Sequence, residues 1–406
     1  MATCTSFYAS GKNGMIRVAF TLIGGKNWTG GYNYLLNLLQ VVQQEVPGQI
    51  APVLLAGTDV SEDELTPFAQ IEGCEIHRRP VFDEGRRSQL LIHSLLMGRH
   101  SEAVGVLEEQ KVDVVFESAI FLGWRMGLPA IAWVPDLQHR YLPQLFSRMA
   151  WWKREMGFRA QIMSGRTVMV SSEDTQLACQ RLYPAAEQKM RAVRFAVRAP
   201  QPMTDEEARG VADRYGLPER YFFMPNQFWV HKNHLLVVQA LKLLRERGET
   251  VTVVATGKQL DPRNAAHVPS LKRAVQDAGV EAEFLMPGMI PYDDLMPLMQ
   301  ASMALLNPSL FEGWSTTVEE ARAAGVPMIL SDLAVHREQA ADQAIYFDRY
   351  SAEALAQTLS GFVPLSLDKR RALRGSARVQ ANRRVNRFAR DFVELVLAAA
   401  TDLQLQ

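Results

Sequence analysis

Two glutamates, Glu312 and Glu320, lie eight positions apart in the segment NPSLFEGWSTTVEEARAAGVPMILS, residues 307–331. Glu312 falls in a turn-rich stretch, and Glu320 falls in the first turn of a helix that Thr316 and Thr317 are expected to cap. The start of a helix exposes unpaired backbone N–H groups and the positive end of the helix dipole, which together favour a phosphate. A carboxylate one turn further along can accept hydrogen bonds from two neighbouring hydroxyls, as on a ribose.

This segment resembles the E-x7-E segment of the retaining glycosyltransferases of family 4, which have the GT-B fold. The resemblance implies that Glu320 binds the ribose of a nucleotide-sugar, that Glu312 faces the transferred sugar, and that Ser315–Thr317 bind the diphosphate. Successive helix residues point about 100° apart, so only one of Glu319 and Glu320 can face the ligand, and the family spacing selects Glu320. The alternative is that these acids lie on an ordinary solvated helix face.

The composition is that of a large enzyme with more than one core. The chain has 406 residues, of which 48% are hydrophobic, so two or three domains are expected. Lys+Arg and Asp+Glu both total 44, and this balance argues against a nucleic-acid-binding protein that relies on bulk positive charge. The few, widely spaced cysteines predict reduced thiols in a cytoplasmic protein, without a disulfide framework or a zinc pattern.

Short apolar runs alternate with helix-length segments, which is the pattern of parallel sheets covered by helices on both faces. A stretch with two prolines near 197–204 is the best candidate for a linker. We therefore predict an α/β fold in which two doubly wound, Rossmann-like domains, 1–198 and 199–385, face each other across a cleft. The GT-B resemblance implies that the C-terminal helices cross back, with 386–406 packing on the first domain. The expected strands are 15–22, 50–57, 74–78, 112–117, 130–134 and 166–171, then 221–225, 251–256, 283–286, 303–306, 328–330 and 344–347.

A glycine-rich loop, GGKNWTGG at 24–31, follows the first expected strand and precedes a helix expected from about residue 32. Glycines let the backbone approach a ligand where a Cβ would collide, and open α/β sheets bind ligands at the carboxyl ends of their strands. The loop has neither a complete G-x-G-x-x-G motif nor a Walker lysine motif, which disfavours a nicotinamide cofactor or ATP. Gly30 and Gly31 resemble the double glycine with which family 4 enzymes reach the donor diphosphate and the acceptor. A plain turn is the alternative.

The segment YFFMPNQFWVHKNH predicts a strand, a polar loop and then a helix. Many family 4 relatives carry a Gly-Arg pair in this loop, with a lysine five residues after the arginine, and both cations bind the diphosphate. In this chain Lys232 matches the lysine, but Asn226 and Gln227 replace the glycine and the arginine. Asn226 and Gln227 can still hydrogen-bond a pyrophosphate or a sugar hydroxyl as neutral groups. The missing arginine leaves more of the phosphate charge to Lys232, to helix-end amides and, in one interpretation, to His231 or His234.

His139 follows the strand expected at 130–134, whose carboxyl end is expected to face the cleft. Family 4 enzymes place a histidine after the corresponding strand, which implies that His139 hydrogen-bonds the donor sugar or shapes the acceptor site. Asp136 is a rival acid or base in the same loop. A retaining GT-B mechanism needs no strong protein base, because the leaving phosphate can take the acceptor's proton and stabilisation of that phosphate carries much of the catalysis.

Two further segments give weaker signals. Gly288 lies in FLMPGMI, which resembles the strand and glycine turn whose backbone meets the nucleobase. The basic segment RMAWWKREMGFR, residues 148–159, contains Trp151 and Trp152. We expect an ordinary helix with core tryptophans and extended cations, and a surface for lipid is the alternative.

These observations and the resemblance predict a retaining, metal-independent glycosyltransferase that needs no cofactor besides its nucleoside-diphosphate-sugar donor. Its expected partners are that donor and a carbohydrate or lipid-linked acceptor in surface polysaccharide or glycoconjugate synthesis, and no nucleic acid. The absence of an Asp-x-Asp motif favours metal independence, because Lys232 and helix-end amides can supply the positive charge. The expected location is the cytoplasm, with peripheral association at the inner face of the membrane left open. Two alternatives remain, namely a GT-B sugar-nucleotide epimerase and a non-catalytic nucleotide-sugar-binding subunit.

Overall fold

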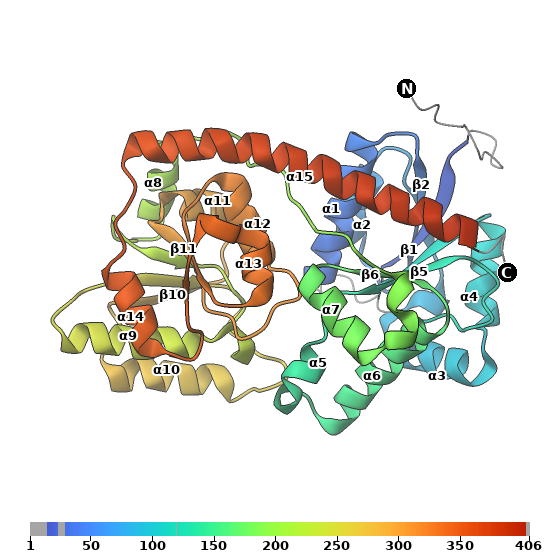
Figure 1. Ribbon diagram of the computed structural model, residues 1–406, viewed down its shortest axis with the longest axis horizontal. Coiled ribbons are helices and arrows are strands. Elements are labelled where there is room, and N and C mark those ends of the chain that lie inside the picture. The colour runs from blue at the N-terminus through green and yellow to red at the C-terminus, as the bar shows by residue number, and fades with distance from the viewer. Residues whose placement is uncertain (1–13, 23–28, 119, 403–406) are drawn as a thin grey trace. The chain divides into compact units, whose positions relative to one another are not determined.

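The computed structural model describes residues 14–22, 29–118 and 120–402, and the chain divides into two compact units. Most of the first half of the chain forms unit 1, and most of the second half forms unit 2 (Figure 1). The chain passes between the units after Phe195, close to the linker expected near 197–204. Unit 1 comprises the described residues up to Leu137, Arg148–Phe195 and the chain from Val385 onward, and unit 2 comprises Gln138–Ser147 and Ala196–Arg384.

Unit 1 contains a parallel sheet of seven strands in the order β3-β2-β1-β4-β5-β6-β7. The order reverses between β1 and β4, as in a doubly wound fold. The sequence pattern predicts the first six strands but not β7, whose three residues are too few to show a period. The strands are β1 Ile16–Leu22, β2 Ile50–Ala56, β3 Glu75–Arg78, β4 Val114–Ser118, β5 Ala130–Val134, β6 Thr167–Val170 and β7 Met190–Ala192.

Aromatic side chains hold the end of the chain against the unit 1 sheet. Phe392, near the C-terminus, lies 6.1 Å from Phe20 of β1 and 5.6 Å from Phe116 of β4, measured between ring centroids. Each of these rings is buried, so the contact removes a large apolar area from water. The unit 1 helices are α1 Thr29–Glu45, α2 Glu62–Ala69, α3 Arg87–Met97, α4 Ser101–Glu109, α6 Arg148–Met163 and α7 Glu173–Leu182.

Unit 2 contains a parallel sheet of six strands in the order β10-β9-β8-β11-β12-β13. All six are predicted by the sequence, because short runs such as Phe222–Met224 are apolar throughout, as expected for parallel strands covered on both faces. The predicted α/β class with two doubly wound sheets is therefore confirmed. The strands are β8 Phe222–Met224, β9 Val253–Thr256, β10 Phe284–Gly288, β11 Ala304–Asn307, β12 Met328–Ser331 and β13 Ala344–Phe347.

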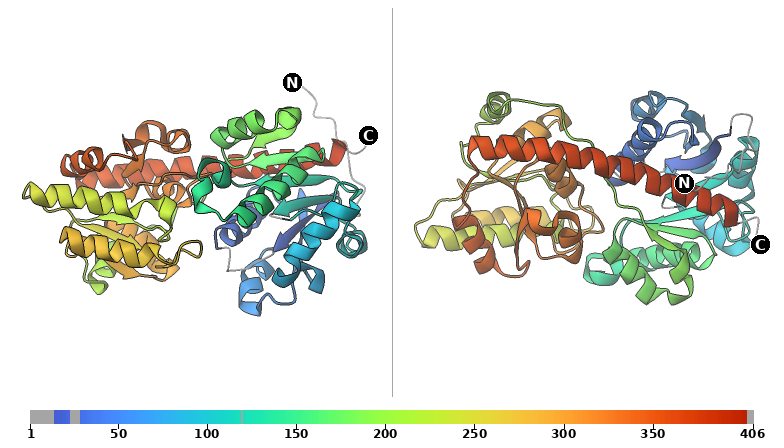
Figure 2. Two further views of the ribbon diagram at one scale, coloured as in Figure 1. Left: turned by 90° about the horizontal axis from the view of Figure 1, so that it is seen from below. Right: turned by 45° about the horizontal axis from the view of Figure 1, so that its top comes forward.

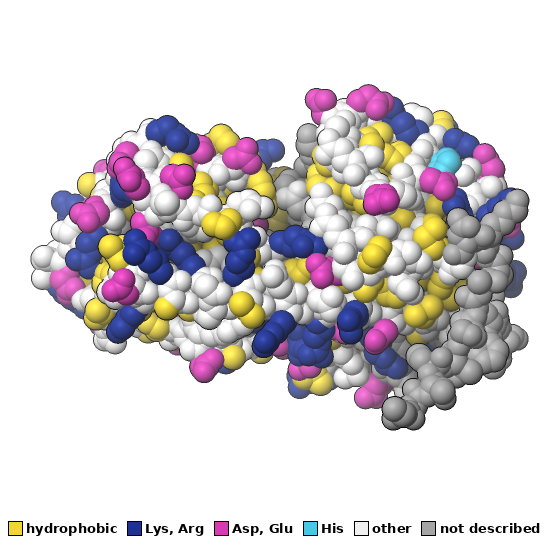
Figure 3. Space-filling model, turned by 90° about the horizontal axis from the view of Figure 1, so that it is seen from above, with side chains coloured by type: hydrophobic (Ala, Val, Ile, Leu, Met, Phe, Trp, Pro, Cys, Tyr) yellow, Lys and Arg dark blue, Asp and Glu magenta, His cyan; other side chains and the backbone are white. Residues whose placement is uncertain are grey.

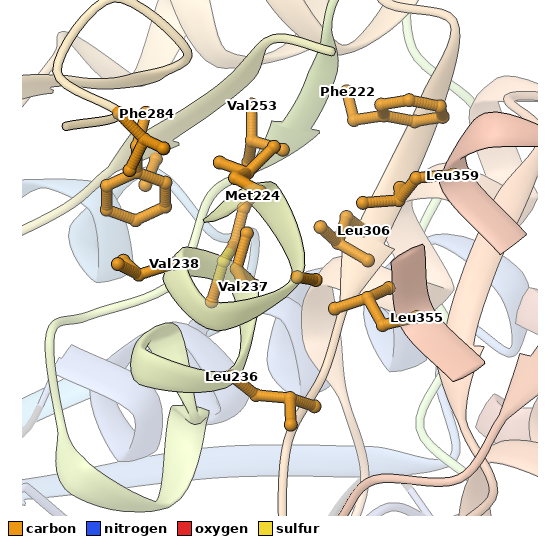
Figure 4. Packing of buried hydrophobic residues seen from close by; sticks show 14 of the residues in the cluster. Phe222, Met224, Leu236, Val237, Val238, Val253, Phe284, Leu306, Leu355 and Leu359 are labelled. Atoms are coloured by element: carbon orange, nitrogen blue, oxygen red, sulfur yellow. The ribbon is translucent and has the colours of Figure 1, made fainter. Parts of the chain in front are cut away.

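Two separate cores cover the two faces of the unit 2 sheet. One packs Met224 and Leu306 against Leu236 of α9 and Leu355 of α14 (Figure 4). The other packs alternate strand residues against α8, α11, α12 and α13, with Val318 of α12 fully buried. The unit 2 helices are α5 Gln138–Tyr141, α8 Asp205–Arg214, α9 His234–Glu246, α10 His267–Ala278, α11 Tyr292–Ala301, α12 Thr316–Ala324, α13 Ala334–Ala340 and α14 Ala352–Ser360.

The C-terminal part of the chain is one helix, α15 Leu367–Asp402, and not the several helices that the sequence suggests (Figures 1 and 2). Its residues up to Arg384 belong to unit 2, and those from Val385 belong to unit 1. In the described residues, no helix has the length and apolar character needed to cross a membrane.

Candidate active site

The strand order of unit 2 reverses between β8 and β11, so the loops after these two strands diverge from one point. The loop after β8 carries Asn226, Gln227 and Lys232, and the loop after β11 carries Glu312 and Ser315. All six strands are parallel, so their carboxyl ends meet at one edge of the sheet. Such a reversal is where open α/β sheets bind ligands, and most of the expected donor-binding residues lie there.

Lys232 and Glu312 form an ion pair at this edge. The Nζ of Lys232 lies 2.6 Å from Oε1 of Glu312, and the two side chains are only 15% and 9% exposed. The loops are also joined through the backbone, because Leu310 N–H donates to the carbonyl of His231 at 2.8 Å. An ammonium has three donors, so Lys232 can hold a second anionic partner while it keeps Glu312.

A network of uncharged side chains positions Glu312. The Ser309 hydroxyl lies 2.7 Å from both Glu312 Oε1 and Asn307 Oδ1, and Asn307 Nδ2 donates to Ser315 Oγ at 2.9 Å. The Ser331 hydroxyl donates to the Ser309 carbonyl at 2.7 Å. Sequence reasoning does not single out this network. Its only signal is that Asn307 and Ser331 are polar residues at the ends of the apolar strands β11 and β12.

The start of α12 differs from the expectation in one respect. The N-cap residue is Ser315, and Thr316 is already the first helical residue, so the threonines do not cap the helix. The Ser315 N–H donates to Gln339 Oε1 at 3.0 Å, and Gln339 Nε2 donates back to the Ser315 carbonyl at 3.0 Å. The amides of Thr316 and Thr317 lie in the first turn, where no earlier turn of the helix supplies an acceptor. They are better placed than Ser315 to bind an anion.

The adjacent acids of α12 lie in different environments. Glu319 is fully buried and accepts hydrogen bonds from Arg322 and Arg384, each at 2.8 Å. Glu320 is half-buried, and among the described residues burial alone, without a hydrogen bond, shifts the pKa of its carboxylate. Burial raises the pKa of Glu320 from 4.5 to about 7. A desolvated carboxylate without a partner gains the most from hydroxyl donors of a ligand, so Glu320 is the stronger candidate for ribose binding.

The loops after β8, β9 and β10 are packed closely together. Gln227 Oε1 accepts from the Lys258 N–H at 3.0 Å, and Asn226 is only 3% exposed. At Gly257, where φ is +142°, an added Cβ would lie 2.7 Å from the Asn226 carbonyl oxygen. The Gly257 N–H donates to the carbonyl of Gly288 at 2.9 Å. Gln227 therefore stabilises the neighbouring loop at the position where the resemblance to family 4 leads us to expect a cation.

The two histidines near Lys232 do not add positive charge. Burial lowers the pKa of His231 well below 6.5, and the nearby cations Lys232 and Arg263 lower it further. Burial lowers the pKa of His234 to about 3, and its ring stacks on Phe228 at a centroid distance of 4.3 Å. These lowered pKa values favour the neutral form of both rings at pH 7, which disfavours the interpretation that either one supplies charge to the diphosphate.

Arg263, on the loop after β9, is a cation near Lys232 that sequence reasoning does not single out. Its Nη2 lies 3.2 Å from Nδ1 of His231, the residue before Lys232. Its guanidinium carbon lies 5.3 Å from the centroid of the Trp229 ring, and Nη1 donates to Gln138 Oε1 at 2.8 Å. The sequence places Arg263 in a loop after an apolar strand, but it does not show which way that long loop turns.

His139 lies in the short helix α5, which is grouped with unit 2 although it follows a unit 1 strand. Its side chain is fully buried, and its ring lies 6.3 Å from that of Phe146. Two residues later, the ring of Tyr141 stacks on Phe311 at 5.6 Å between centroids. Because Phe311 precedes Glu312, the segment that contains His139 packs against the loop that contains Glu312.

Only some of the candidate site residues expected in unit 1 lie within the described part of the chain. Gly30 and Gly31 lie in the first turn of α1 and not in the loop before it, because the helix begins at Thr29. The rest of the glycine-rich loop, from residue 24 to 28, is outside the described residues. Asp136 accepts a hydrogen bond from Arg154 at 2.7 Å, and this ion pair makes it a poor rival as general base.

The tryptophans of α6 are not core residues, contrary to the expectation. Trp152 is 60% exposed, and Trp151 is half-buried with its ring 4.9 Å from that of Trp152. Met149 and Met156 on the same helix are 81% and 45% exposed. The helix therefore presents a surface that mixes apolar side chains with its cations.

Known proteins resemble this chain in part of its sequence and in its fold. Residues 213–380, which contain all the candidate unit 2 residues except His139, match the family model described as glycosyl transferases group 1. The mannosylfructose-phosphate synthase of Agrobacterium fabrum is 21% identical over 132 residues. That match covers 32% of this chain but only 29% of the synthase, so the chain matches less than a third of this relative.

Solved structures that resemble nearly the whole chain include the following two. A glycosyltransferase from Rickettsia africae has a TM-score of 0.68 at 15% identity, covering 95% of this chain and 98% of its own. The Anabaena protein HepE, solved in complex with UDP and glucose, has a TM-score of 0.69 at 14% identity, covering 94% of this chain and 100% of its own. At these identities the likeness shows the fold. The chain thus has the GT-B fold of glycosyltransferases, and its residues 213–380 match glycosyl transferases group 1.

Proposed function

We propose that the protein is a retaining glycosyltransferase of family 4. It moves a sugar from a nucleoside-diphosphate-sugar to a carbohydrate or lipid-linked acceptor. The observation that carries the proposal is the Lys232–Glu312 ion pair at the strand-order reversal of unit 2, followed eight residues later by Glu320. These three residues lie within the part of the chain that matches glycosyl transferases group 1.

Each part of the donor has a matching group at this edge. The Glu320 carboxylate has no protein partner among the described residues and accepts the two ribose hydroxyls. Lys232 and the amides of Thr316 and Thr317 bind the diphosphate, because an ammonium and a helix N-terminus both favour phosphate oxygens. Glu312 lies 2.6 Å from Lys232 and therefore reaches the sugar attached to that diphosphate.

In the proposed reaction the bond between the sugar's anomeric carbon and the diphosphate oxygen breaks. The acceptor's hydroxyl oxygen bonds to that carbon from the same face, and its proton passes to the leaving phosphate. Charge grows on the phosphate as the bond breaks, so Lys232 stabilises the transition state more than the bound donor. Lys232 and the helix amides supply positive charge without a metal ion, which supports metal-independent transfer.

The surface of α6 supports an acceptor at a membrane. Its exposed Trp152, Met149 and Met156 could enter the interfacial layer of a bilayer, while the neighbouring cations Lys153 and Arg159 contact lipid phosphates. We propose peripheral association of this kind at the cytoplasmic face, with a role in surface polysaccharide or glycoconjugate synthesis.

The proposal is tested by donor binding and by the product. UDP-glucose is the first donor to try, because HepE was solved with UDP and glucose, followed by GDP- and dTDP-sugars. A bound donor should raise the melting temperature, and product NMR should show a new glycosidic bond with the anomeric configuration of the donor. Glu312→Gln should bind the donor but transfer little.

Other results would lead to other conclusions. A rearranged nucleotide-sugar in place of a glycoside would identify an epimerase. Donor binding with neither transfer nor slow hydrolysis of the donor would identify a binding subunit. Inversion of the anomeric centre would refute the retaining mechanism, and loss of transfer in EDTA, with recovery on addition of Mg²⁺ or Mn²⁺, would refute metal independence.

A further inference from the structure

Unit 2 contains a cavity of about 440 Å³ that none of the candidate donor-binding residues lines. Its walls are the linker residues 199–205, the ends of α11 and α12, and the first half of α15. The volume is within the range of about 300–1,000 Å³ that is typical of small-molecule sites. Pro200, Pro202 and Met203 make part of the wall apolar.

Three arginines of α15 line the cavity, and one acid faces them. Arg374 Nη1 lies 2.8 Å from Asp205 Oδ1, and Arg371 Nε lies 4.0 Å from Oδ2 of the same residue. Arg378 instead donates to the carbonyl of Pro200 at 3.4 Å. With three positive charges and one negative charge, the lining has an uncompensated charge that suits an anion.

The arrangement of these arginines is unfavourable for the helix itself. Arg371, Arg374 and Arg378 are spaced three and four residues apart on one face, where like charges repel. They also lie in the N-terminal half of α15, although cations are more stable near a helix C-terminus. Lys and Arg side chains gather along this half of the helix in the view from above (Figure 3). A bound anion would offset both penalties.

A buried amide at the cavity also lacks a partner. Gln300, at the end of α11, is 6% exposed, and its Oε1 accepts no hydrogen bond from the described residues. Its backbone carbonyl accepts from Arg374 Nη2 at 3.3 Å, so the residue lies beside one of the arginines. A buried acceptor without a donor is costly, and a turn of the Gln300 side chain toward the cavity would let a ligand hydroxyl satisfy it.

We propose that this cavity binds a small phosphate monoester that carries hydroxyl groups. Arg371 and Arg378 bind the phosphate through paired N–H donors, for which a guanidinium is suited. Gln300 Oε1, once its side chain turns toward the cavity, accepts from a hydroxyl, and the proline-rich wall covers the rest of the ligand. The site is independent of the proposed transferase activity. The ligand would join the linker to α15. The linker follows the point at which the chain enters unit 2, at Ala196, and α15 contains the point at which the chain leaves it, after Arg384.

Calorimetry of the full chain with glycerol 3-phosphate, inorganic phosphate and glycerol tests the site. Glycerol 3-phosphate should bind roughly fivefold more tightly than inorganic phosphate, the effect of about one net hydrogen bond, and glycerol should not bind detectably. Bound glycerol 3-phosphate should also slow amide exchange in residues 199–205. The Arg371→Ala/Arg378→Ala variant keeps the Arg374–Asp205 pair and should lose at least about tenfold in affinity.

Three control variants separate this site from other causes of binding. Arg383→Ala removes an exposed charge of the same helix that does not line the cavity, and affinity should not change. Lys232→Ala should leave binding intact, because the donor site is elsewhere. Gln300→Met keeps the side-chain length and should abolish only the preference for glycerol 3-phosphate over phosphate.

The proposal fails if neither probe binds, or if the double arginine variant binds as the wild type does. If Arg383→Ala loses as much affinity as the double arginine variant, the probes are attracted non-specifically to a basic helix. Loss in Lys232→Ala would assign the probes to the donor site. If Gln300→Met keeps the preference, Gln300 does not make the hydroxyl contact. If the wild type itself binds glycerol 3-phosphate no more tightly than phosphate, the cavity binds only an inorganic anion.

Discussion

The carboxylates of Glu319 and Glu320 follow one another in α12, yet only that of Glu319 is paired with arginines. The Glu320 carboxylate is desolvated and has no hydrogen-bond partner among the described residues. Glu319 thus holds α12 against α15 through Arg384, and the carboxylate of Glu320 is available to a ligand.

Glu320→Gln should stabilise the protein at high pH and have little effect at low pH. The pKa of Glu320 in the folded protein is raised from 4.5 to about 7, so stability falls as the pH rises through this window and the carboxyl ionises in a desolvated place. A pKa shift of this size would lower the free energy of unfolding by up to about 3 kcal/mol at high pH. Because the side chain is partly exposed, we expect a loss on the order of 1 kcal/mol. We expect Glu320→Gln to raise the melting temperature by roughly 2–4 °C at pH 8 and not at pH 4.5. A rise of equal size at both pH values would show that ionisation is not the cause.

Nucleotide-sugar affinity should rise between pH 6 and pH 8 because ribose hydroxyls bind the ionised form of Glu320. Removal of the Glu320 carboxylate should cost on the order of 1.5–3 kcal/mol of binding free energy at pH 8. The measurement is calorimetry with an intact nucleotide-sugar and no acceptor, since a free nucleoside diphosphate has a phosphate that titrates in the same range. Glu320→Gln should bind weakly at both pH values, and a pH dependence that survives in it would assign the titration elsewhere.

Lys232→Ala should damage turnover more than donor binding, because the charge on the leaving phosphate grows as the glycosidic bond breaks. We expect kcat to fall by about 10²–10³ with a smaller change in KM. Lys258→Ala is the matched control, because its side chain is exposed on the next loop and its backbone bond to Gln227 remains. A normal kcat in Lys232→Ala would show that the lysine is peripheral.

Arg263→Ala should weaken donor binding by roughly tenfold, because Arg263 is a second cation near a site where Gln227 replaces the usual arginine. Arg263→Lys keeps the charge but loses the planar contact with Trp229, so it should recover part of the affinity. If the double variant Arg263→Ala/Gln227→Arg binds no better than Arg263→Ala, Arg263 does not replace the missing arginine.

Glu312→Gln and His139→Gln should each reduce transfer while free nucleoside-diphosphate affinity stays nearly unchanged. Both residues are assigned to the sugar and not to the nucleotide. Because His139 is fully buried, glutamine is chosen to limit the cavity that alanine would leave. Transfer rates and nucleotide calorimetry should be compared with those of Glu320→Gln. Strong loss of nucleotide binding in Glu312→Gln would mean that the roles of the two glutamates are exchanged.

Much of the fold follows from the sequence because parallel strands buried on both faces are apolar throughout. The run at Ala130–Val134, buried throughout, gives the bounds of β5 directly, and the apolar run at Ala344–Phe347 gives those of the edge strand β13. The three residues of β7 carry no such pattern, because Arg191 is exposed. The grouping of α5 with unit 2 depends on contacts between residues far apart in the chain, such as Tyr141 and Phe311.

The candidate site could be predicted where the sequence carries the spacing of a family 4 motif. Glu312, Glu320 and Lys232 were singled out by that resemblance. The neutral state of His231 could not be read from the sequence, because it depends on burial. Arg263 was missed because only the folded loop brings it beside that histidine.

The close approach at Gly257 has a consequence for protein engineering. The loops after β8 and β9 share the hydrogen bond from Lys258 N–H to Gln227 and a second one from Val230 N–H to Asp261 Oδ2 at 3.0 Å. Because a Cβ at position 257 would lie only 2.7 Å from the Asn226 carbonyl oxygen, a larger residue there would force the two loops apart. Donor preference should therefore be transferable between relatives only when both loops are grafted together, whereas a graft of either loop alone should misplace Lys232.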